Sequence, residues 1–322
     1  MKKRPKLGLA LGAGAARGLA HIGVLKVLHK NNIYPDYLAG TSMGAVIAAA
    51  YAAGKTPQEL EIIATTADWK NMVDFTPPKV GLLQGKLIEK KILDLVENKK
   101  FHQLNIPLQV VAYNLTKKKK ALFSKGDVTK AVRASLSMPG IVAPVTIDHK
   151  QYVDGMIVDP TPFDIVKNMG AEVVIGVDLY NREEKVERPE VKEKNLAKEL
   201  KQKFVADELL NLRKYLIPDF WPEMAKKIFR WGFDKLLRPT RILKIMAGRE
   251  PPEFTKVLYK ALTVITNNFA RERMEHADIQ FKIRPKFDGL GWLDFDKAEK
   301  MIAIGEEAMK KELPRLRRML VF

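Results

Sequence analysis

The stretch Tyr37-Leu38-Ala39-Gly40-Thr41-Ser42-Met43-Gly44-Ala45-Val46-Ile47-Ala48-Ala49-Ala50 places a serine between two glycines in an otherwise apolar run. A strand can turn directly into a helix only where side chains are nearly absent, and Gly40 and Gly44 provide this on either side of Ser42. The G-x-S-x-G pattern predicts an outward-pointing hydroxyl at a helix N-terminus, with the backbone N–H of Met43 facing any oxyanion that forms. The plainer alternative is a serine in an ordinary strand-to-helix turn.

The composition limits the possible classes of protein. With 322 residues, of which 46% are hydrophobic, the chain can fill the core of one large α/β domain or two modest ones. It contains no cysteine, which excludes disulfides, thiolate metal sites and a cysteine nucleophile. The basic N-terminus lacks a signal-peptide cleavage pattern, and no apolar run approaches the ~20 residues of a membrane-spanning helix. We therefore expect a cytoplasmic protein.

The net charge of +18 indicates an anionic partner, either nucleic acid or an anionic membrane surface. The basic residues are interspersed with acidic ones, and the sequence contains no recognised nucleic-acid-binding motif. A peripheral association with an anionic membrane is therefore the preferred hypothesis, and no nucleic acid is expected as a partner. The sequence does not indicate an oligomeric state.

A second glycine-containing loop lies near the N-terminus. Residues 7–11 are typical of a buried strand, and they lead into Gly12-Ala13-Gly14-Ala15-Ala16-Arg17-Gly18 and then into a helix that ends near Asn31. A dinucleotide-binding fingerprint would need its third glycine at the position of Arg17, and no Lys-Ser or Lys-Thr follows as in a Walker loop. The loop still offers free backbone N–H groups to a phosphate or to a transient oxyanion.

Taken together, three motifs in this order resemble those of bacterial patatin-like phospholipases: the glycine loop ending in Arg17-Gly18, the G-x-S-x-G of residues 40–44, and Asp154-Gly155. The resemblance covers roughly residues 7–180. Within this range it includes the segments that flank the motifs, at residues 19–25 and 131–140. Two departures from the family pattern stand out. Alanines occupy positions 13 and 15, where many members have glycine, and Met156 replaces the second glycine of the usual Asp-Gly-Gly.

The resemblance implies a three-layer α/β/α fold with a mostly parallel central sheet and an inserted helical region. It also implies a catalytic dyad in which Asp154 takes the proton of Ser42 directly, without a metal or an organic cofactor. The implied oxyanion hole consists of Gly12, Ala13, Gly14, Ala15 and Met43. The implied supporting residues are Arg17, Gly18, Gly40, Gly44 and Gly155. The guanidinium of Arg17 stays charged, so we expect it to tie the loop structurally.

A serine nucleophile more often relies on a histidine, and the chain has five of them. None stands in a recognisable triad context. We expect His21 and His29, on the first helix, to serve packing or to lie at the surface. His149 lies in a predicted hairpin turn close to Asp154 in sequence and stays a candidate third member of a triad.

The remaining pattern predicts further helices and strands and three regions of the chain. The predicted elements are helices over residues 56–67, 86–97, 160–170, 254–275 and 295–313, and strands over residues 108–113, 145–147, 151–153, 172–179 and 277–283. Residues 68–85 are expected to form a loop, and the lysines at 117–120 a solvated hairpin turn. Residues 7–181 would form the catalytic core, 182–252 an inserted basic helical segment, and 253–322 a helix-strand-helix that completes the core.

The inserted segment is a candidate for membrane docking because it combines aromatic and basic side chains. The candidate residues are Trp221, Lys226, Lys227, Arg230 and Trp231. The alternative is a helical cap whose aromatic side chains pack on the core. The resulting functional hypothesis is a serine acyl hydrolase, such as a phospholipase, lysophospholipase or carboxylesterase, that cleaves fatty acyl esters of lipids. The alternative function is a non-catalytic lipid-binding or regulatory protein on the same fold.

Overall fold

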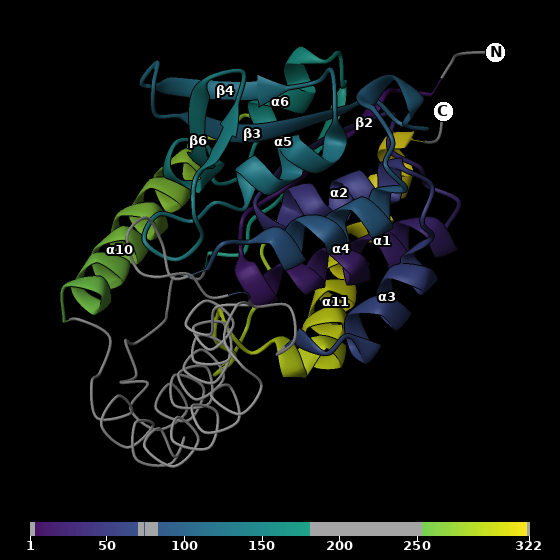
Figure 1. Cartoon of the computed structure of the whole chain (residues 1–322). Helices are drawn as coiled ribbons and strands as arrows, with labels where there is room; N and C mark the ends of the chain where they lie inside the picture. Colours follow the sequence, from purple (N-terminus) through teal and green to yellow (C-terminus); the bar gives the residue numbers. More distant parts are fainter. Residues whose placement is uncertain (1–3, 70–73, 75–82, 181–252, 321–322) are drawn as a thin grey trace, which may run out of the picture. The chain divides into compact units, whose positions relative to one another are not determined.

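The structure is a computed structural model, which describes residues 4–69, 74, 83–180 and 253–320 (Figure 1). The chain divides into two compact units, residues 1–183 with 260–322 and residues 184–259. The first unit contains the sheet described below. Within the described residues, no helix combines the length and the apolar character needed to cross a membrane.

An eight-stranded mixed sheet forms the centre of the first unit. Its strands are β1 (Leu7–Leu11), β2 (Tyr37–Thr41), β3 (Leu108–Asn114), β4 (Lys119–Phe123), β5 (Val145–Ile147), β6 (Lys150–Asp154), β7 (Val173–Val177) and β8 (Phe281–Ile283). Strands β3, β2, β1, β7 and β8 are parallel neighbours, whereas β4, β5 and β6 pair antiparallel. The mostly parallel sheet predicted from the sequence is confirmed.

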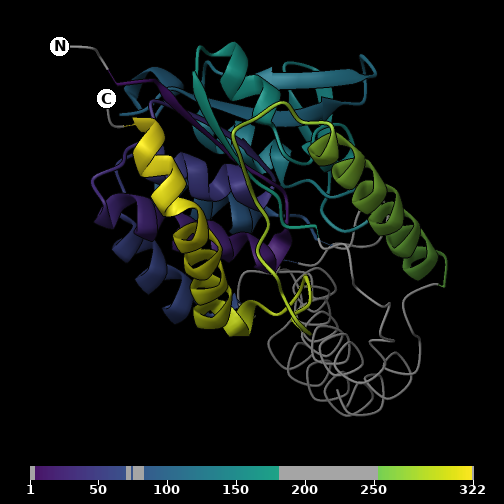
Figure 2. The same ribbon diagram turned by 180° about the vertical axis from the view of Figure 1, so that it is seen from behind.

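Helices cover both faces of the sheet, and each strand divides its side chains between them. The helices are α1 (Ala20–Lys30), α2 (Met43–Ala52), α3 (Pro57–Thr66), α4 (Lys86–Val96), α5 (Val128–Ser135), α6 (Phe163–Asn168), α10 (Glu253–Glu275) and α11 (Ala298–Leu320). Leu9 and Leu38 face the layer that contains α1, α2 and α11, which Figures 1 and 2 show gathered on one side. Ala10 and Ala39 face the layer of α6 and the end of α10. This alternation produces the three-layer α/β/α architecture.

Helices α1 and α11 pack with their backbones in contact. A Cβ atom at Gly23 would lie 2.0 Å from the carbonyl oxygen of Ile302, and one at Gly305 would lie 1.9 Å from that of Ala20. Only glycine fits at either position, because any side chain would collide with backbone atoms. Figure 2 shows α11 in yellow along its full length.

Helix α11 is longer than the sequence predicted, and β8 is shorter. The predicted helix ended at residue 313, but the helix continues to Leu320 with Pro314 inside it. Leu316, beyond the proline, is fully buried, so core packing offsets the hydrogen bond that the proline cannot donate. The predicted strand over residues 277–283 is restricted to Phe281–Ile283.

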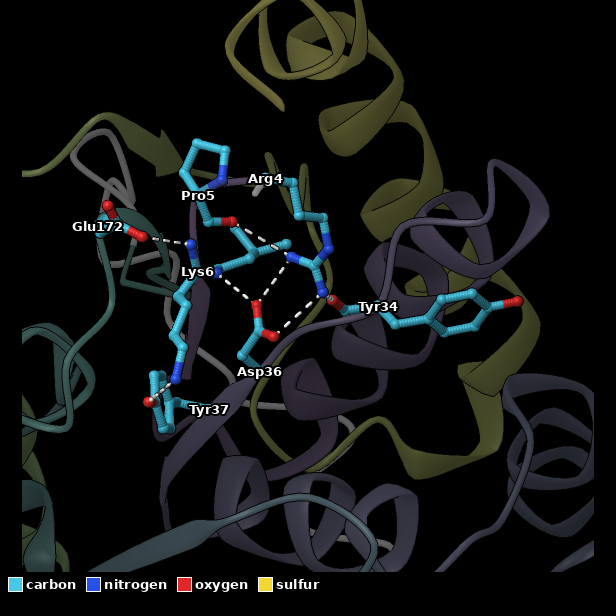
Figure 3. Close-up of polar contacts among 8 residues, drawn as sticks. Arg4, Pro5, Lys6, Tyr34, Asp36, Tyr37 and Glu172 are labelled. Carbon is cyan, nitrogen blue, oxygen red and sulfur yellow. Dashed lines mark hydrogen bonds and ion pairs between the residues drawn. The ribbon is translucent and has the colours of Figure 1, made fainter. Parts of the chain in front are cut away.

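A cluster of polar contacts holds the amino ends of the central strands (Figure 3). The carboxylate of Asp36 accepts hydrogen bonds from the Leu7 N–H at 2.7 Å and from the Arg4 guanidinium at 2.8 and 3.1 Å. Glu172, just before β7, accepts the N–H of Lys6 at 2.8 Å. These bonds satisfy backbone donors at the start of β1 and fix the ends of β1, β2 and β7 to one another.

Strands β2 and β6 share one edge of β3 and meet there end to end. Thr41, the last residue of β2, is opposite Val111, and Asp154, the last residue of β6, is opposite Ala112. The other edge of β3 is taken by β4, where Ala121 is opposite Ala112. Because β2 and β6 run in opposite directions, their carboxyl ends occupy consecutive positions along β3. Figure 1 shows the two strands toward opposite ends of β3.

The register of β6 is set by a two-residue turn. Ile147 pairs with Lys150, which leaves Asp148 and His149 as the turn, with φ angles of 48° and 60°. Positive φ at both positions is the geometry of a type I′ turn, which favours Asn-Gly. The Asp148-His149 pair adopts this geometry without a glycine, so the turn carries strain at both residues.

We predict that His149→Gly stabilises the protein by about 0.5–1 kcal/mol. A non-glycine residue in the left-handed region costs about 1–2 kcal/mol, part of which is offset by the greater freedom of glycine in the unfolded chain. Urea denaturation monitored by circular dichroism measures the change. Thr146→Gly is the control, because Thr146 is exposed on β5 in a regular strand position and its replacement should destabilise the protein. A His149→Gly variant less stable than the wild type would contradict the prediction.

Candidate active site

Ser42 occupies a strained turn between β2 and α2. Its φ and ψ angles are 55° and −125°, which few residues other than glycine adopt, and 4% of its surface is exposed. A Cβ atom at Gly44 would lie 2.1 Å from the carbonyl oxygen of Leu11, and one at Gly40 would lie 2.5 Å from the Cα of Ala45. Both glycines are therefore required by close backbone approach. The strand-turn-helix predicted around Ser42 is present, although its hydroxyl is nearly buried.

The hydroxyl of Ser42 donates a hydrogen bond of 2.7 Å to Oδ2 of Asp154. The other carboxylate oxygen, Oδ1, accepts the N–H of Met156 at 2.8 Å. Burial raises the pKa of the Asp154 carboxyl to about 7, although the hydrogen bonds from Ser42 and Met156 lower it. The two side chains, separated by 112 residues in the chain, therefore form a pair in which a poised carboxylate faces a serine hydroxyl.

None of the five histidines takes part in this pair. Neither Ser42 nor Asp154 has a histidine as a hydrogen-bond partner. His149 is exposed in the β5–β6 turn, whereas Asp154 is at the far end of β6. At about 3.3 Å per residue, roughly 16 Å of strand separates the two positions. This arrangement does not favour a triad with His149.

The glycine loop continues β1 into a short 3₁₀ helix, η1 (Ala15–Leu19). The N–H of Gly12 donates to the carbonyl of Val177 at 3.1 Å, and that of Ala13 donates to the carbonyl of Pro160 at 2.8 Å. These two amides are engaged in holding the loop, which corrects the expectation that they line an oxyanion hole. The amides of Gly14 and Ala15 have no acceptor among the described residues. Ala15 has a φ angle of 43°.

Met43 supplies a further backbone donor at the start of α2. Its N–H begins the helix and has no acceptor within the described part of the chain. Gly18 lies against the Met43 side chain, because a Cβ atom there would be 2.2 Å from Met43 Cγ. The loop after β1 and the helix after β2 are thus packed directly against each other.

His21 anchors the glycine loop, a role that the sequence did not indicate. Its Nε2 lies 2.8 Å from the carbonyl oxygen of Gly12, and because a carbonyl only accepts, Nε2 carries the proton. Burial lowers the pKa of the imidazole to about 4, so the ring is neutral at physiological pH. The expectation of a packing role was therefore right but incomplete. The only sign of this role in the sequence is the position of the histidine, three residues after Gly18.

Arg17 ties the loop to the segment before α11, in agreement with the structural role expected for it. The buried guanidinium donates from Nε and Nη2 to the carbonyl of Leu290 at 3.0 and 2.7 Å. It also lies over the rings of Phe287 and Trp292, with its carbon 5.2 and 4.8 Å from the ring centroids. These contacts hold the loop by charge-assisted hydrogen bonds and cation–π interactions.

The departure at Met156 leaves the contact with Asp154 intact. The bond to Oδ1 comes from the backbone N–H, which every residue except proline supplies. The side chain, 8% exposed, packs in an apolar cluster with Ala13, Tyr180 and Ala270. Gly155 is required beside it, because a Cβ atom there would lie 2.6 Å from the carbonyl oxygen of Val111.

A buried ion-pair network adjoins the serine turn. The carboxylate of Asp159 is fully buried and contacts Lys120 Nζ at 2.9 Å and Arg273 Nη2 at 3.0 Å. Its backbone carbonyl accepts the hydroxyl of Thr41 at 2.8 Å, next to Ser42. Lys120 was expected in a solvated turn, but it is the partner of a buried carboxylate. Sequence alone gave no sign of this pairing, because the two residues belong to different elements.

Two expectations from the sequence stay predictions. The candidate docking residues Trp221, Lys226, Lys227, Arg230 and Trp231 lie outside the described residues. The division into a core, an inserted segment and a completing segment also stays a prediction. Within the described ranges, no group of three or more histidine or acidic side chains could hold a metal ion.

We predict that Asp154→Asn stabilises the fold at pH 8 by on the order of 3 kcal/mol. The folded-state pKa of about 7 lies above the usual 3.8, so burial of the charged form costs stability as the pH rises from about 4 to 7. Asparagine keeps the shape and can bond both Ser42 and Met156. Denaturation of the wild type and of Asp154→Asn between pH 4 and 8 measures the difference in their free energies of unfolding. His21 is present in both proteins, so its titration cancels in this difference. A gain that does not grow with pH would contradict the assignment of a buried, charged Asp154.

Comparison with known proteins supports one family. Residues 9–167 match the model of the patatin-like phospholipase family. An uncharacterized NTE-family protein of Mycobacterium tuberculosis is 35% identical over 182 residues, which cover 56% of this chain and 50% of that protein. A lysophospholipase of Aspergillus fumigatus is 25% identical over 97% of this chain and 18% of its own length. The crystal structure of VipD from Legionella pneumophila is similar with a TM-score of 0.47 and 12% identity, over 98% of this chain and 67% of that one.

The chain thus spans about half the length of the mycobacterial relative. The matched domain contains the glycine loop, the serine turn and Asp154, the three elements that form the site. Over residues 9–167, just under half of its length, the chain is therefore similar to the patatin-like phospholipase family.

Proposed function

We propose that the protein is a serine acyl hydrolase that cleaves fatty acyl esters of lipids. The observation that carries the proposal is the 2.7 Å hydrogen bond from Ser42 Oγ to Asp154 Oδ2, in a turn where the serine immediately precedes α2. The match of residues 9–167 to the patatin-like phospholipase family model supports the same reaction class. A relative named lysophospholipase supports a lipid ester as the substrate. Phospholipase, lysophospholipase and carboxylesterase activities are all variants of this hydrolysis.

The proposed reaction proceeds through an acyl-enzyme. Asp154 accepts the hydroxyl proton as Ser42 Oγ attacks the ester carbonyl, and it then returns that proton to the departing alcohol. Water attacks the acyl-serine, with Asp154 again as the base, and the fatty acid leaves with Ser42 restored. A carboxylate with a pKa near 7 is a stronger base than an ordinary aspartate, and about half of it is ionised at neutral pH.

The proposed oxyanion donors are the backbone N–H groups of Gly14, Ala15 and Met43. The first two follow the engaged amides of Gly12 and Ala13, and the third begins α2. Backbone donors held by a rigid loop need no rearrangement when charge develops on the carbonyl oxygen. No step of this mechanism calls for a metal or an organic cofactor.

The competing function is a non-catalytic lipid-binding protein on the same fold. Its motivation in the sequence is Met156 beside the proposed base. The contact with Asp154 comes from the Met156 backbone and the side chain packs in an apolar cluster, so hydrolysis is the better-supported proposal.

We predict that Ser42→Ala abolishes hydrolysis across a panel of phospholipids, lysophospholipids and short esters. The variant lacks the nucleophilic oxygen, so its residual rate should match that of the uncatalysed reaction. A fluorophosphonate probe should label the wild-type protein at Ser42 and leave the variant unlabelled. Undiminished hydrolysis by Ser42→Ala would refute the proposal, and vesicle binding without turnover of any ester by the wild type would favour the lipid-binding alternative.

The pH dependence of hydrolysis should report the protonation of the Asp154 carboxyl. We predict that kcat/KM falls on the acidic side with a midpoint near pH 7, because protonation of the carboxyl removes the base. Asp154→Asn should lose activity at every pH while staying folded. His149→Ala is the control and should keep both the rate and the midpoint. Loss of activity in His149→Ala with an unchanged melting temperature would require a triad instead.

An anionic membrane surface is the proposed docking partner. The net charge of +18 and the aromatic and basic residues of segment 182–252 support it. We predict tighter binding to phosphatidylglycerol vesicles than to phosphatidylcholine vesicles, weakened by salt because screening reduces the attraction. The double variant Trp221→Ala, Trp231→Ala should bind less while hydrolysing a short soluble ester at the wild-type rate. Equal binding to both vesicles, or unfolding of the variant, would favour a packed cap.

A further inference from the structure

The backbone N–H of Ser42 needs an acceptor that neither neighbouring element supplies. Strand β2 ends at Thr41, and Ser42 itself is the residue that precedes the first turn of α2. An N–H buried at this point without a partner would destabilise the turn, which is already strained at a φ angle of 55°. Some other group must therefore hold the Ser42 amide in place.

Ser135, the last residue of α5, supplies the missing acceptor. Its Oγ accepts the N–H of Ser42 at 2.8 Å, and Ser135 is fully buried. The contact is made to the backbone of Ser42, so it leaves the Ser42 hydroxyl free to bond Asp154. Ser42 is thus held at two points: its hydroxyl bonds the proposed base, Asp154, and its backbone amide bonds Ser135.

The segment after Ser135 also holds the proposed base. The carbonyl of Ser137 accepts the N–H of Asp154 at 2.9 Å. Arg133, buried on α5, fixes this segment by donating to Ser137 Oγ at 2.8 Å and to the carbonyls of Gly85 and Gln84 at 3.0 and 2.7 Å. One short, rigid segment therefore contacts the backbones of both members of the pair.

We propose that Ser135 is a positioning residue for the hydrolysis: its oxygen holds the Ser42 amide so that Ser42 Oγ stays within hydrogen-bond distance of Asp154. The inference rests on the proposed function and extends it to a residue that touches neither the substrate nor the reacting oxygen. Without this bond the strained turn relaxes, and the serine oxygen moves away from the carboxylate. Displacements of about 1 Å cost on the order of a hundredfold in rate.

The first test compares Ser135→Ala with a matched control on the same helix. Thr129 is also buried on α5, and its Oγ1 has no hydrogen-bond partner among the described residues. Ser135→Ala should lower kcat by roughly 10- to 100-fold with KM changed by less than about twofold, and it should slow fluorophosphonate labelling in parallel. Thr129→Val, which also removes a buried hydroxyl, should keep wild-type values.

The second test follows the Asp154 carboxyl directly and does not depend on turnover. The hydrogen bond from Ser42 lowers the pKa of Asp154, so its loss should raise that pKa above the wild-type value. The carboxyl band in the infrared spectrum, assigned by its absence in Asp154→Asn, should therefore titrate at a higher pH in Ser135→Ala. A merely structural role of Ser135 would lower the melting temperature without moving this midpoint.

The outcomes separate the inference from the proposed function. Wild-type kcat and an unchanged Asp154 midpoint in Ser135→Ala would overturn the inference, while loss of activity in Ser42→Ala would leave the hydrolase proposal intact. Failure of the wild type to hydrolyse any ester would sink the hydrolase proposal, and the infrared midpoint would still decide whether Ser135 holds the pair. If Ser135→Ala does not fold, Ser135→Cys replaces it, because the thiol keeps a weak acceptor. We expect Ser135→Cys to show a smaller fall in kcat and a smaller rise in the Asp154 midpoint.

Discussion

The site depends on two strands that end against each other along one edge of β3. Because β2 and β6 run in opposite directions on that edge, each delivers the residue at its carboxyl end to the same point, Ser42 just beyond one and Asp154 at the other. A slip of one residue in either ladder would move its side chain by about 3.3 Å and turn it to the other face of the sheet. The sheet register is therefore the main determinant of the distance between the two reactive groups.

This geometry is maintained at a cost in stability. The Asp154 carboxyl is buried where its charge is poorly solvated, and Ser42 and Ala15 both have φ angles unfavourable for residues with a side chain. The surrounding contacts offset this cost. Arg17 and His21 hold the glycine loop. Ser135 at the end of α5 and Ser137 just after it hold the backbones of the reactive pair. A strained residue, Ser42, and a buried carboxyl, Asp154, thus meet where the chemistry is proposed, beside a large apolar core cluster.

The sequence predicted the parts of the site that local patterns encode. Glycines beside Ser42 and after Asp154 indicated the turns, and apolar periodicity indicated most strands and helices. It could not show that the amides of Gly12 and Ala13 are engaged, because their acceptors are about 150 residues away in the chain. The same reason hid three further features: the pairing of Lys120 with a buried carboxylate, the role of Ser135, and the continuation of α11 through its proline. Each depends on a tertiary contact, and a local pattern carries no record of its distant partner.

The glycine contact between α1 and α11 constrains how the protein is made. The backbone at Gly23 is covered by residues near Gly305, some 280 positions further along the chain. At 5–20 residues per second, a ribosome takes roughly 14 to 56 s to synthesise that interval. During this time the face of α1 that packs on α11 has no native partner on the nascent chain. The helix that follows the glycine loop therefore reaches its final packing only after translation of α11, and the exposed face is a natural substrate for a chaperone until then.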